Sequence, residues 1–100
     1  MSVNIDLTFE IGGLADMAAV KAVVPAVRRL LDSERIDSMS GRIRPSAKGG
    51  FSVSCESDYA LSVSRSYQWC PEFEQALAEC VRQFAPTADV QVYWDYRDED

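Results

Sequence analysis

Residues 3–11 alternate between apolar and polar side chains. The odd positions are apolar, and the even positions are Asn4, Asp6, Thr8 and Glu10. A period of two is typical of a strand with one buried and one exposed face. Gly12-Gly13 follows, and we expect it to end the strand. The apolar positions are Val3, Ile5, Leu7, Phe9 and Ile11.

After the glycines the apolar spacing becomes helical. The apolar residues are separated by three or four positions, which predicts one stripe of an amphipathic helix. Pro25 lies inside this pattern and removes a backbone donor. We expect either a kinked helix or a second short helix that opens at Pro25. The stripe consists of Met17, Val20, Val24, Val27 and Leu31.

Three short strands are predicted beyond a polar loop at 32–40, because period-two patterns return there. The segments 41–46 and 51–56 are joined by Ala47-Lys48-Gly49-Gly50, which is a strong turn signal. Ser57-Asp58 is a further turn before the segment 59–66. These segments predict a three-stranded meander.

A second helix is predicted to begin at Pro71. Proline at the first helical position with Glu72 and Glu74 behind it is typical of a helix N-terminus. Pro86 ends this helix, a closing strand follows at 90–96, and residues 97–100 form a frayed acidic tail. The apolar face of the helix consists of Phe73, Leu77, Cys80, Val81 and Phe84.

This order of elements predicts one α+β domain spanning residues 1–100. The order is β-α-β-β-β-α-β, and two helices on one face of an antiparallel or mixed sheet account for every apolar stripe. We therefore expect a ferredoxin-like two-layer sandwich that carries one extra strand.

The charge of the chain argues against nucleic acid as a direct ligand. Sixteen acidic and ten basic residues give a formal charge of −6 and a pI near 4.5. Nucleic-acid affinity comes largely from Lys and Arg on phosphates. The acids are concentrated at both ends, since residues 1–20 carry −3, residues 21–48 carry +4 and residues 49–100 carry −7. A surface of this kind attracts basic partners.

The sequence has no histidine. This excludes Ser-His-Asp and Cys-His catalysis and histidine-ligated metals. The glycine pairs match no phosphate-binding loop, and the paired carboxylates are expected to be exposed and therefore poor general acids. We expect a protein that is not an enzyme and that has no cofactor and no metal.

The three cysteines have no Cys-x-x-Cys spacing, which argues against a disulfide framework and structural zinc. Cys55 and Cys80 fall on apolar faces and are expected to be buried and reduced. Cys70 precedes Pro71, where a helix dipole would lower the pKa of a thiol. Without a histidine as base, we interpret Cys70 as part of the helix start.

The N-terminus lacks a basic region followed by an apolar run, and no apolar stretch is long enough to span a bilayer. We therefore expect a cytoplasmic protein without membrane contact. Among the aromatic residues, Trp94 is expected in the core, and Trp69 is the better candidate for an exposed anchor on a partner.

The face of the sheet opposite the helices is expected to be polar and acidic, with several serines. In size, charge and α+β pattern, the chain resembles the small acidic phage-encoded anti-CRISPR inhibitors, some of which mimic DNA, and the bacterial immunity proteins. This resemblance implies a monomeric inhibitor of a basic, nucleic-acid-binding protein or complex. The predicted contact residues are Asp6, Glu10, Glu56, Glu72, Glu74, Glu79 and Asp95.

Two alternatives stay open beside the inhibitor. The polar sheet can simply be a solvated face. The domain can also be an oligomeric ligand-binding or regulatory module, in which two flat, serine-rich faces pair with each other. The basic strand around Arg42 and Arg44 is the single candidate for phosphate contact, and it lacks interleaved aromatic residues.

Overall fold

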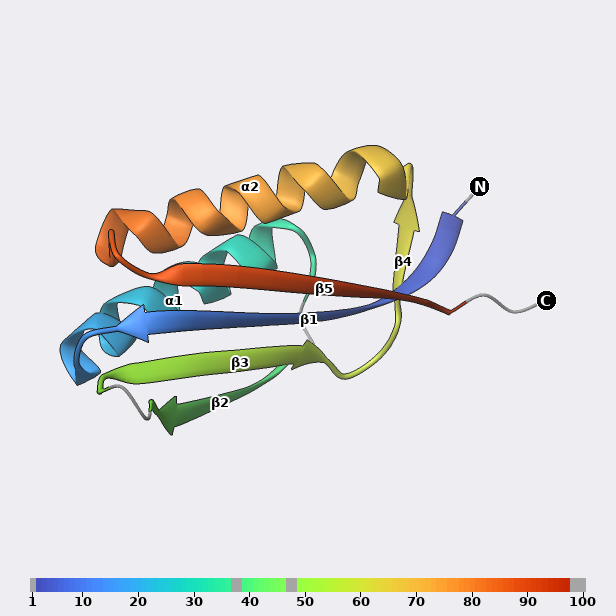
Figure 1. Cartoon of the computed structure of the whole chain (residues 1–100). Helices are drawn as coiled ribbons and strands as arrows, with labels where there is room; N and C mark the ends of the chain where they lie inside the picture. The colour runs from blue at the N-terminus through green and yellow to red at the C-terminus, as the bar shows by residue number, and fades with distance from the viewer. Residues whose placement is uncertain (1, 37–38, 47–48, 98–100) are drawn as a thin grey trace.

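The computed structural model describes residues 2–36, 39–46 and 49–97, which form two helices and one antiparallel sheet of five strands (Figure 1). The predicted α+β class and the predicted order of elements are therefore correct. The elements are β1 (Ser2–Leu14), α1 (Met17–Ser33), β2 (Met39–Pro45), β3 (Phe51–Ser57), β4 (Leu61–Ser64), α2 (Ser66–Phe84) and β5 (Asp89–Arg97).

The long strand β1 organises the sheet, because three other strands pair with it. β5 pairs along Asn4–Gly12. Along the opposite edge of β1, β4 pairs with Ser2–Ile5 and β3 with Thr8–Leu14. β2 pairs with β3 on the outside. This order differs from a simple ferredoxin-like layout, since one edge of β1 is shared by two strands.

The predicted meander is wrong beyond the hairpin of β2 and β3. β3 and β4 follow one another along the same edge of β1, so the connection between them does not reverse the chain. At this junction the backbone N–H of Leu7 donates to the hydroxyl of Ser57 at 3.0 Å. The Ser57 hydroxyl thus accepts the hydrogen bond that a carbonyl of a paired strand would otherwise accept, at the point where the pairing of β1 changes from β4 to β3.

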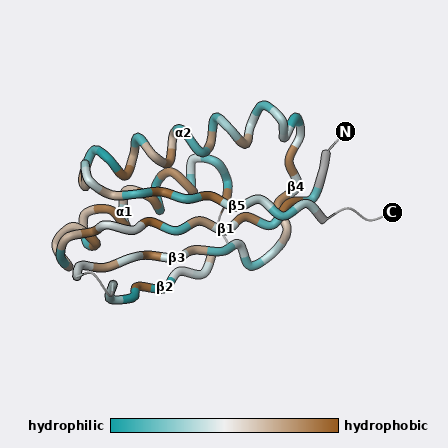
Figure 2. The backbone as a smooth tube through the Cα atoms, in the orientation of Figure 1, coloured by the Kyte–Doolittle hydropathy of each residue, from teal (hydrophilic) through white to brown (hydrophobic). Residues whose placement is uncertain are grey.

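Both helices cover the same face of the sheet. The side chains of Leu7, Phe9 and Ile11 are at most 1% exposed and belong to one core cluster with buried residues of α1 and α2. The even positions Thr8 and Glu10 are exposed. The predicted alternation is therefore confirmed where the side chains are described, and Figure 2 shows hydrophobic and polar positions alternating along the strands.

The glycines after Ile11 do not end the strand as predicted. β1 continues to Leu14, and its register with β3 shifts between Ile11 and Leu14. Gly13 has φ +74°, a conformation that is cheap for glycine. The pair therefore forms an irregularity of the bulge type inside the strand.

α1 is one continuous helix, so no second helix begins at Pro25. Asp16 caps its N-terminus, because its Oδ1 accepts from the backbone N–H of Ala19 at 2.9 Å. At the C-terminus, Ile36 donates to the carbonyl of Leu31 at 2.8 Å, with Arg35 in the left-handed region at φ +62°. This is a Schellman termination with arginine at the position that favours glycine.

α2 begins at Ser66, five residues before the predicted start at Pro71. Proline is tolerated inside the helix, because the carbonyl that loses its donor belongs to the exposed Tyr67. The earlier turn is held by core contacts, since Cys70 is buried and Trp69 half-buried against the core. In the described residues, neither helix is long and apolar enough to cross a membrane.

Candidate functional site

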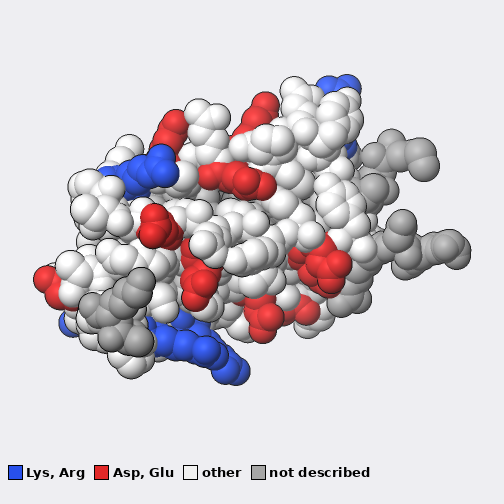
Figure 3. All heavy atoms as spheres, in the orientation of Figure 1, with Lys and Arg blue, Asp and Glu red and all other residues white. Residues whose placement is uncertain are grey.

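Four of the seven predicted contact residues lie together on the open face of the sheet. The register places Asp6, Glu10, Glu56 and Asp95 on the face opposite the helices. Glu10, Glu56 and Asp95 are exposed and Asp6 is half-buried. Figure 3 shows acidic side chains spread over the strands on this side of the molecule. We call these four residues the acidic face.

The acidic face extends over three strands. Thr8 is opposite Glu56, so Asp6 and Glu10 are the two diagonal neighbours of Glu56. Diagonal neighbours across a sheet are about 7–8 Å apart. Asp95 is directly opposite Asp6 on β5, which corresponds to about 5 Å between Cβ atoms. The four residues therefore form a connected row in which neighbouring positions are about 5–8 Å apart.

The pair Asp6 and Asp95 has an electrostatic cost. Like charges directly opposite each other destabilise a sheet. Hydrophobic packing on the other side of the same strands holds the two residues in this register, since Leu7 is opposite the half-buried Trp94.

Arginines border the acidic face at the edge strand. Arg42 and Arg44 are opposite Ser54 and Ser52, so both lie on the open face, and both are exposed. Figure 3 shows basic side chains gathered along the edge formed by β2. The acidic surface is thus limited to β1, β3 and β5.

The three predicted glutamates of α2 do not belong to the acidic face. Glu72 and Glu79 are exposed on a helix of the opposite layer. Glu74, expected to be an exposed contact residue because it lies off the apolar face of the helix, is instead half-buried and accepts a hydrogen bond of 2.5 Å from Nε1 of Trp94. The predicted set is therefore divided between two surfaces.

Asp89 is a member of the open face that the sequence interpretation missed. It is exposed and opposite Gly12 at the start of β5. Gln91 and Tyr93 alternate on the open face of the closing strand. Extending this alternation by two residues toward the N-terminus would have placed Asp89 on the same face. Tyr93 itself is exposed on this face, and its hydroxyl donates to Oε1 of Gln91.

The tryptophans pack together with Phe73 at the edge of the core. The ring centroids of Trp69 lie 5.2 Å from Phe73 and 5.6 Å from Trp94. Nε1 of Trp69 donates to Glu34 at 3.0 Å. Trp69 is half-buried, so the prediction of an exposed anchor is wrong, because α2 begins before it and directs it onto the core.

The cysteines are free, and their environments do not activate them. Burial raises the pKa of Cys55 to about 11, although Arg28 acts in the opposite direction. Burial also raises the thiol pKa of Cys70 and of Cys80. Cys70 is the buried one, whereas Cys55 and Cys80 are half-buried, contrary to expectation. The expected influence of a helix start on Cys70 fails because it lies inside α2.

No polar or charged residue is buried in the part of the chain that the structure describes. In the same part of the chain, no group of three or more histidine, cysteine, aspartate or glutamate residues is placed to hold a metal ion.

Comparisons with known proteins reveal similarity of fold. No family model and no curated protein matches the chain. A protein of unknown function from Galdieria sulphuraria superposes over 97% of this chain and 50% of its own, with TM-score 0.51 and 17% identity. The Bacillus subtilis YXEP protein, a dinuclear metal binding peptidase from the M20 family, superposes over 96% of this chain and 26% of its own, with TM-score 0.50 and 12% identity. The chain thus spans half or less of both proteins.

Proposed function

We propose that this protein is a non-enzymatic inhibitor that binds a basic, nucleic-acid-binding protein through the acidic face, in place of nucleic acid. The observation that carries the proposal is the row of carboxylates from Asp95 through Asp6 and Glu56 to Glu10. No helix covers it, because both helices pack on the other face of the sheet. A nucleic-acid-binding surface carries Lys and Arg that are arranged to meet closely spaced anions.

The pair of Asp6 and Asp95 on the open face also suits a basic partner. Asp6 and Asp95 repel each other across neighbouring strands. A basic partner would bring positive charge close to both carboxylates, which favours association. Electrostatic complementarity of this kind mainly accelerates association and excludes wrong partners.

Face-to-face pairing of two copies is a weaker explanation of the same surface. Such pairing would bring the acidic face of one copy against the acidic face of the other, which costs free energy. A monomer with a basic partner avoids this cost. The arginines of β2 lie at the border of the face and would meet acidic groups at the rim of the partner surface.

The proposal includes a ferredoxin-like interpretation of the sheet. β3 and β4 follow each other along one edge of β1, so we interpret them as a single strand interrupted at Ser57. The sheet then has four positions, in the order β2, β3 with β4, β1 and β5. This interpretation adds no functional residue, but it accounts for the extra strand without an additional layer.

Two double variants with equal charge changes test the acidic face. In the first, Glu10→Gln is combined with Glu56→Gln; in the control, Glu72→Gln is combined with Glu79→Gln. All four residues are exposed glutamates, and each variant removes two negative charges. The immobilised proteins are incubated with nuclease-treated cell extract, and retained proteins are eluted with double-stranded DNA or with salt rising from about 50 to about 200 mM.

Wild type and the helix control are expected to retain the same basic proteins, and DNA is expected to elute them. The sheet variant is expected to retain much less. Equal retention by the sheet variant and wild type would overturn the assignment of the surface. Retained proteins that DNA fails to displace would overturn nucleic-acid mimicry.

A further inference from the structure

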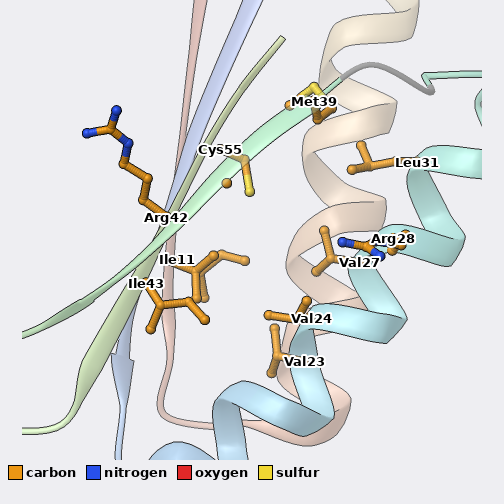
Figure 4. Close-up of a pocket in the computed structure, with 12 residues that line it drawn as sticks. Ile11, Val23, Val24, Val27, Arg28, Leu31, Met39, Arg42, Ile43 and Cys55 are labelled. Carbon is orange, nitrogen blue, oxygen red and sulfur yellow. The ribbon is translucent and has the colours of Figure 1, made fainter. Parts of the chain in front are cut away.

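A cavity of about 230 Å³ lies between α1 and the strands β2 and β3 (Figure 4). Its walls are mostly apolar. Val23, Val24, Val27 and Leu31 line it from α1, and Met39 and Ile43 line it from β2. The cavity therefore lies on the helix side of the sheet, on the opposite side of the strands from the acidic face.

The cavity remains open because α1 covers β2 incompletely. Ile43 is opposite Val53 and therefore belongs to the helix-facing side of the sheet, yet 50% of its surface is exposed. Val53 on the neighbouring strand is buried. Val24 and Met39 are half-buried. An apolar ligand placed here would cover surface that folding alone leaves in contact with water.

Gly41 lines the cavity from β2, and the lack of a side chain at this position leaves part of the cavity open. Its φ lies outside the left-handed region, so the backbone does not require glycine, and glycine weakens a strand. A Cβ at this position would meet Sγ of Cys55 at 3.4 Å, which is ordinary contact. Glycine inside a strand often marks a bulge, a tight bend, or a site where a ligand or another backbone segment approaches closely. The structure thus gives no packing reason for the missing side chain.

The charge at the cavity is positive. Among the described residues, the charged ones that line it are Arg28 and Arg42, and none of these lining residues is acidic. Figure 4 shows the guanidinium of Arg28 directed toward the cavity and that of Arg42 directed away from it. Arg28 also acts electrostatically on the thiol of Cys55, so its charge is felt on the opposite wall.

We propose that this cavity binds a small monocarboxylate with an apolar body, whose tail lies between α1 and β2 and whose carboxylate pairs with Arg28. A cavity of about 150 Å³ accommodates benzene, so this one suits an apolar body of about six to eight carbon atoms. Arginine is well matched to a carboxylate, because two of its N–H groups can donate in parallel. The site is independent of the acidic face and of any protein partner.

Methyl NMR of the whole chain, titrated with octanoate, tests the proposal. Saturable shifts are expected for the methyl signals of Val24, Val27 and Ile43. The indole signals of Trp69 and Trp94 should stay unchanged, since neither residue lines the cavity. Octylamine serves as the probe of equal length and opposite charge, and it is expected to bind at least about tenfold more weakly.

Two substitutions separate the apolar and the charged contribution. Gly41→Val fills the cavity with a side chain suited to a strand, and it is expected to abolish the octanoate shifts. If this variant fails to fold, Gly41→Ala, whose Cβ makes ordinary contact, is expected to fold and to bind more weakly than wild type. Arg28→Gln is expected to weaken octanoate binding about tenfold and to strengthen the binding of octylamine, because the variant removes the charge that attracts a carboxylate and repels an ammonium group.

Three results would overturn the proposal. The first is the absence of saturable methyl shifts with octanoate. The second is octylamine binding as tight as that of octanoate, because the site would then not select a carboxylate. The third is unchanged octanoate affinity in a folded variant of Gly41, because the ligand would then lie elsewhere.

Discussion

Among the glycines, Gly50, immediately before β3, leaves the least room for a side chain. Gly50 has φ +80°, and a Cβ at this position would lie 2.3 Å from the carbonyl oxygen of Leu14. The next atoms that it would meet are the carbonyl carbon of Leu14 at 3.2 Å and Cα of Ala15 at 3.5 Å. All three atoms belong to the backbone, so no side-chain rotation can relieve the overlap. We therefore predict that Gly50→Ala strongly destabilises the fold.

The neighbouring residue provides the magnitude and the control. Gly49 has φ +94°, and a Cβ there would have no atom within 4 Å. Gly49→Ala should cost only the left-handed conformation, about 1–2 kcal/mol. Gly50→Ala should cost the same amount plus about 1–3 kcal/mol for the overlap. The expected total for Gly50→Ala is about 2–5 kcal/mol, which is a large part of the roughly 5–15 kcal/mol that stabilises a domain of this size.

Urea denaturation measures both variants. Trp69 and Trp94 pack against Phe73, so their fluorescence follows the loss of the core. The midpoint should fall much further for Gly50→Ala than for Gly49→Ala, with similar slopes in both transitions. Equal losses of unfolding free energy would refute the reasoning, because the close approach of Gly50 to Leu14 would then contribute nothing.

Three further predictions concern single positions. Arg35→Gly should raise the free energy of unfolding by about 1 kcal/mol, because Arg35 has φ +62° at a helix end where glycine is unstrained; thermal denaturation that shows no gain would contradict this. Asp95→Asn should stabilise the isolated protein by about 0.2–1 kcal/mol through loss of repulsion from Asp6, and the gain should shrink in high salt; a gain that is insensitive to salt would point to another cause. Burial raises the pKa of Cys55 from 9.0 to about 11, so the folded state keeps a proton that the unfolded state releases. The difference in unfolding free energy between wild type and Cys55→Val should therefore be constant below pH 9. It should shift against wild type by roughly 2 kcal/mol as the pH rises through 11, after allowance for partial exposure. Urea titrations that show a constant difference across this range would refute the effect of burial.

The apolar pattern predicted the elements well, because each element buries one stripe of side chains. The alternation around Phe9 and the helical spacing around Val27 depend only on which side of one element is apolar. Which strand pairs with which is not determined by this pattern. The residues around Leu61 alternate correctly, but alternation does not specify an edge, and β4 pairs with β1 instead of β3. The prediction that the second helix begins at Pro71 failed because the packing of Trp69 and Cys70 stabilises an earlier helical turn.

The candidate sites were predictable to different extents. The carboxylates of β1, β3 and β5 share the open face, as the period of two requires. The glutamates of α2 were predicted in the same set of contact residues, and the sequence left open whether the sheet or this helix is the binding surface, because exposure alone does not say which layer a residue belongs to. The cavity beside Gly41 was missed, since its walls come from α1 and three strands and its opening depends on a side chain that is absent. The sequence did carry one signal of the cavity: Gly41 stands between Met39 and Ile43, at a position of the alternating pattern where a third apolar side chain would be expected.

The central position of β1 has a consequence for how the chain folds during synthesis. Gly12 pairs with Asp89, and Asn4 pairs with Arg97, so the strand meets its longest partner only after at least 77 further residues. At roughly 5–20 residues per second, the ribosome needs about 4–15 s to produce that distance. Throughout this interval β1 lacks the strand that completes its second edge, and an apolar strand with an open edge can associate with other chains. The nascent protein should therefore depend on α1, or on a chaperone, to shield β1 until β5 is available.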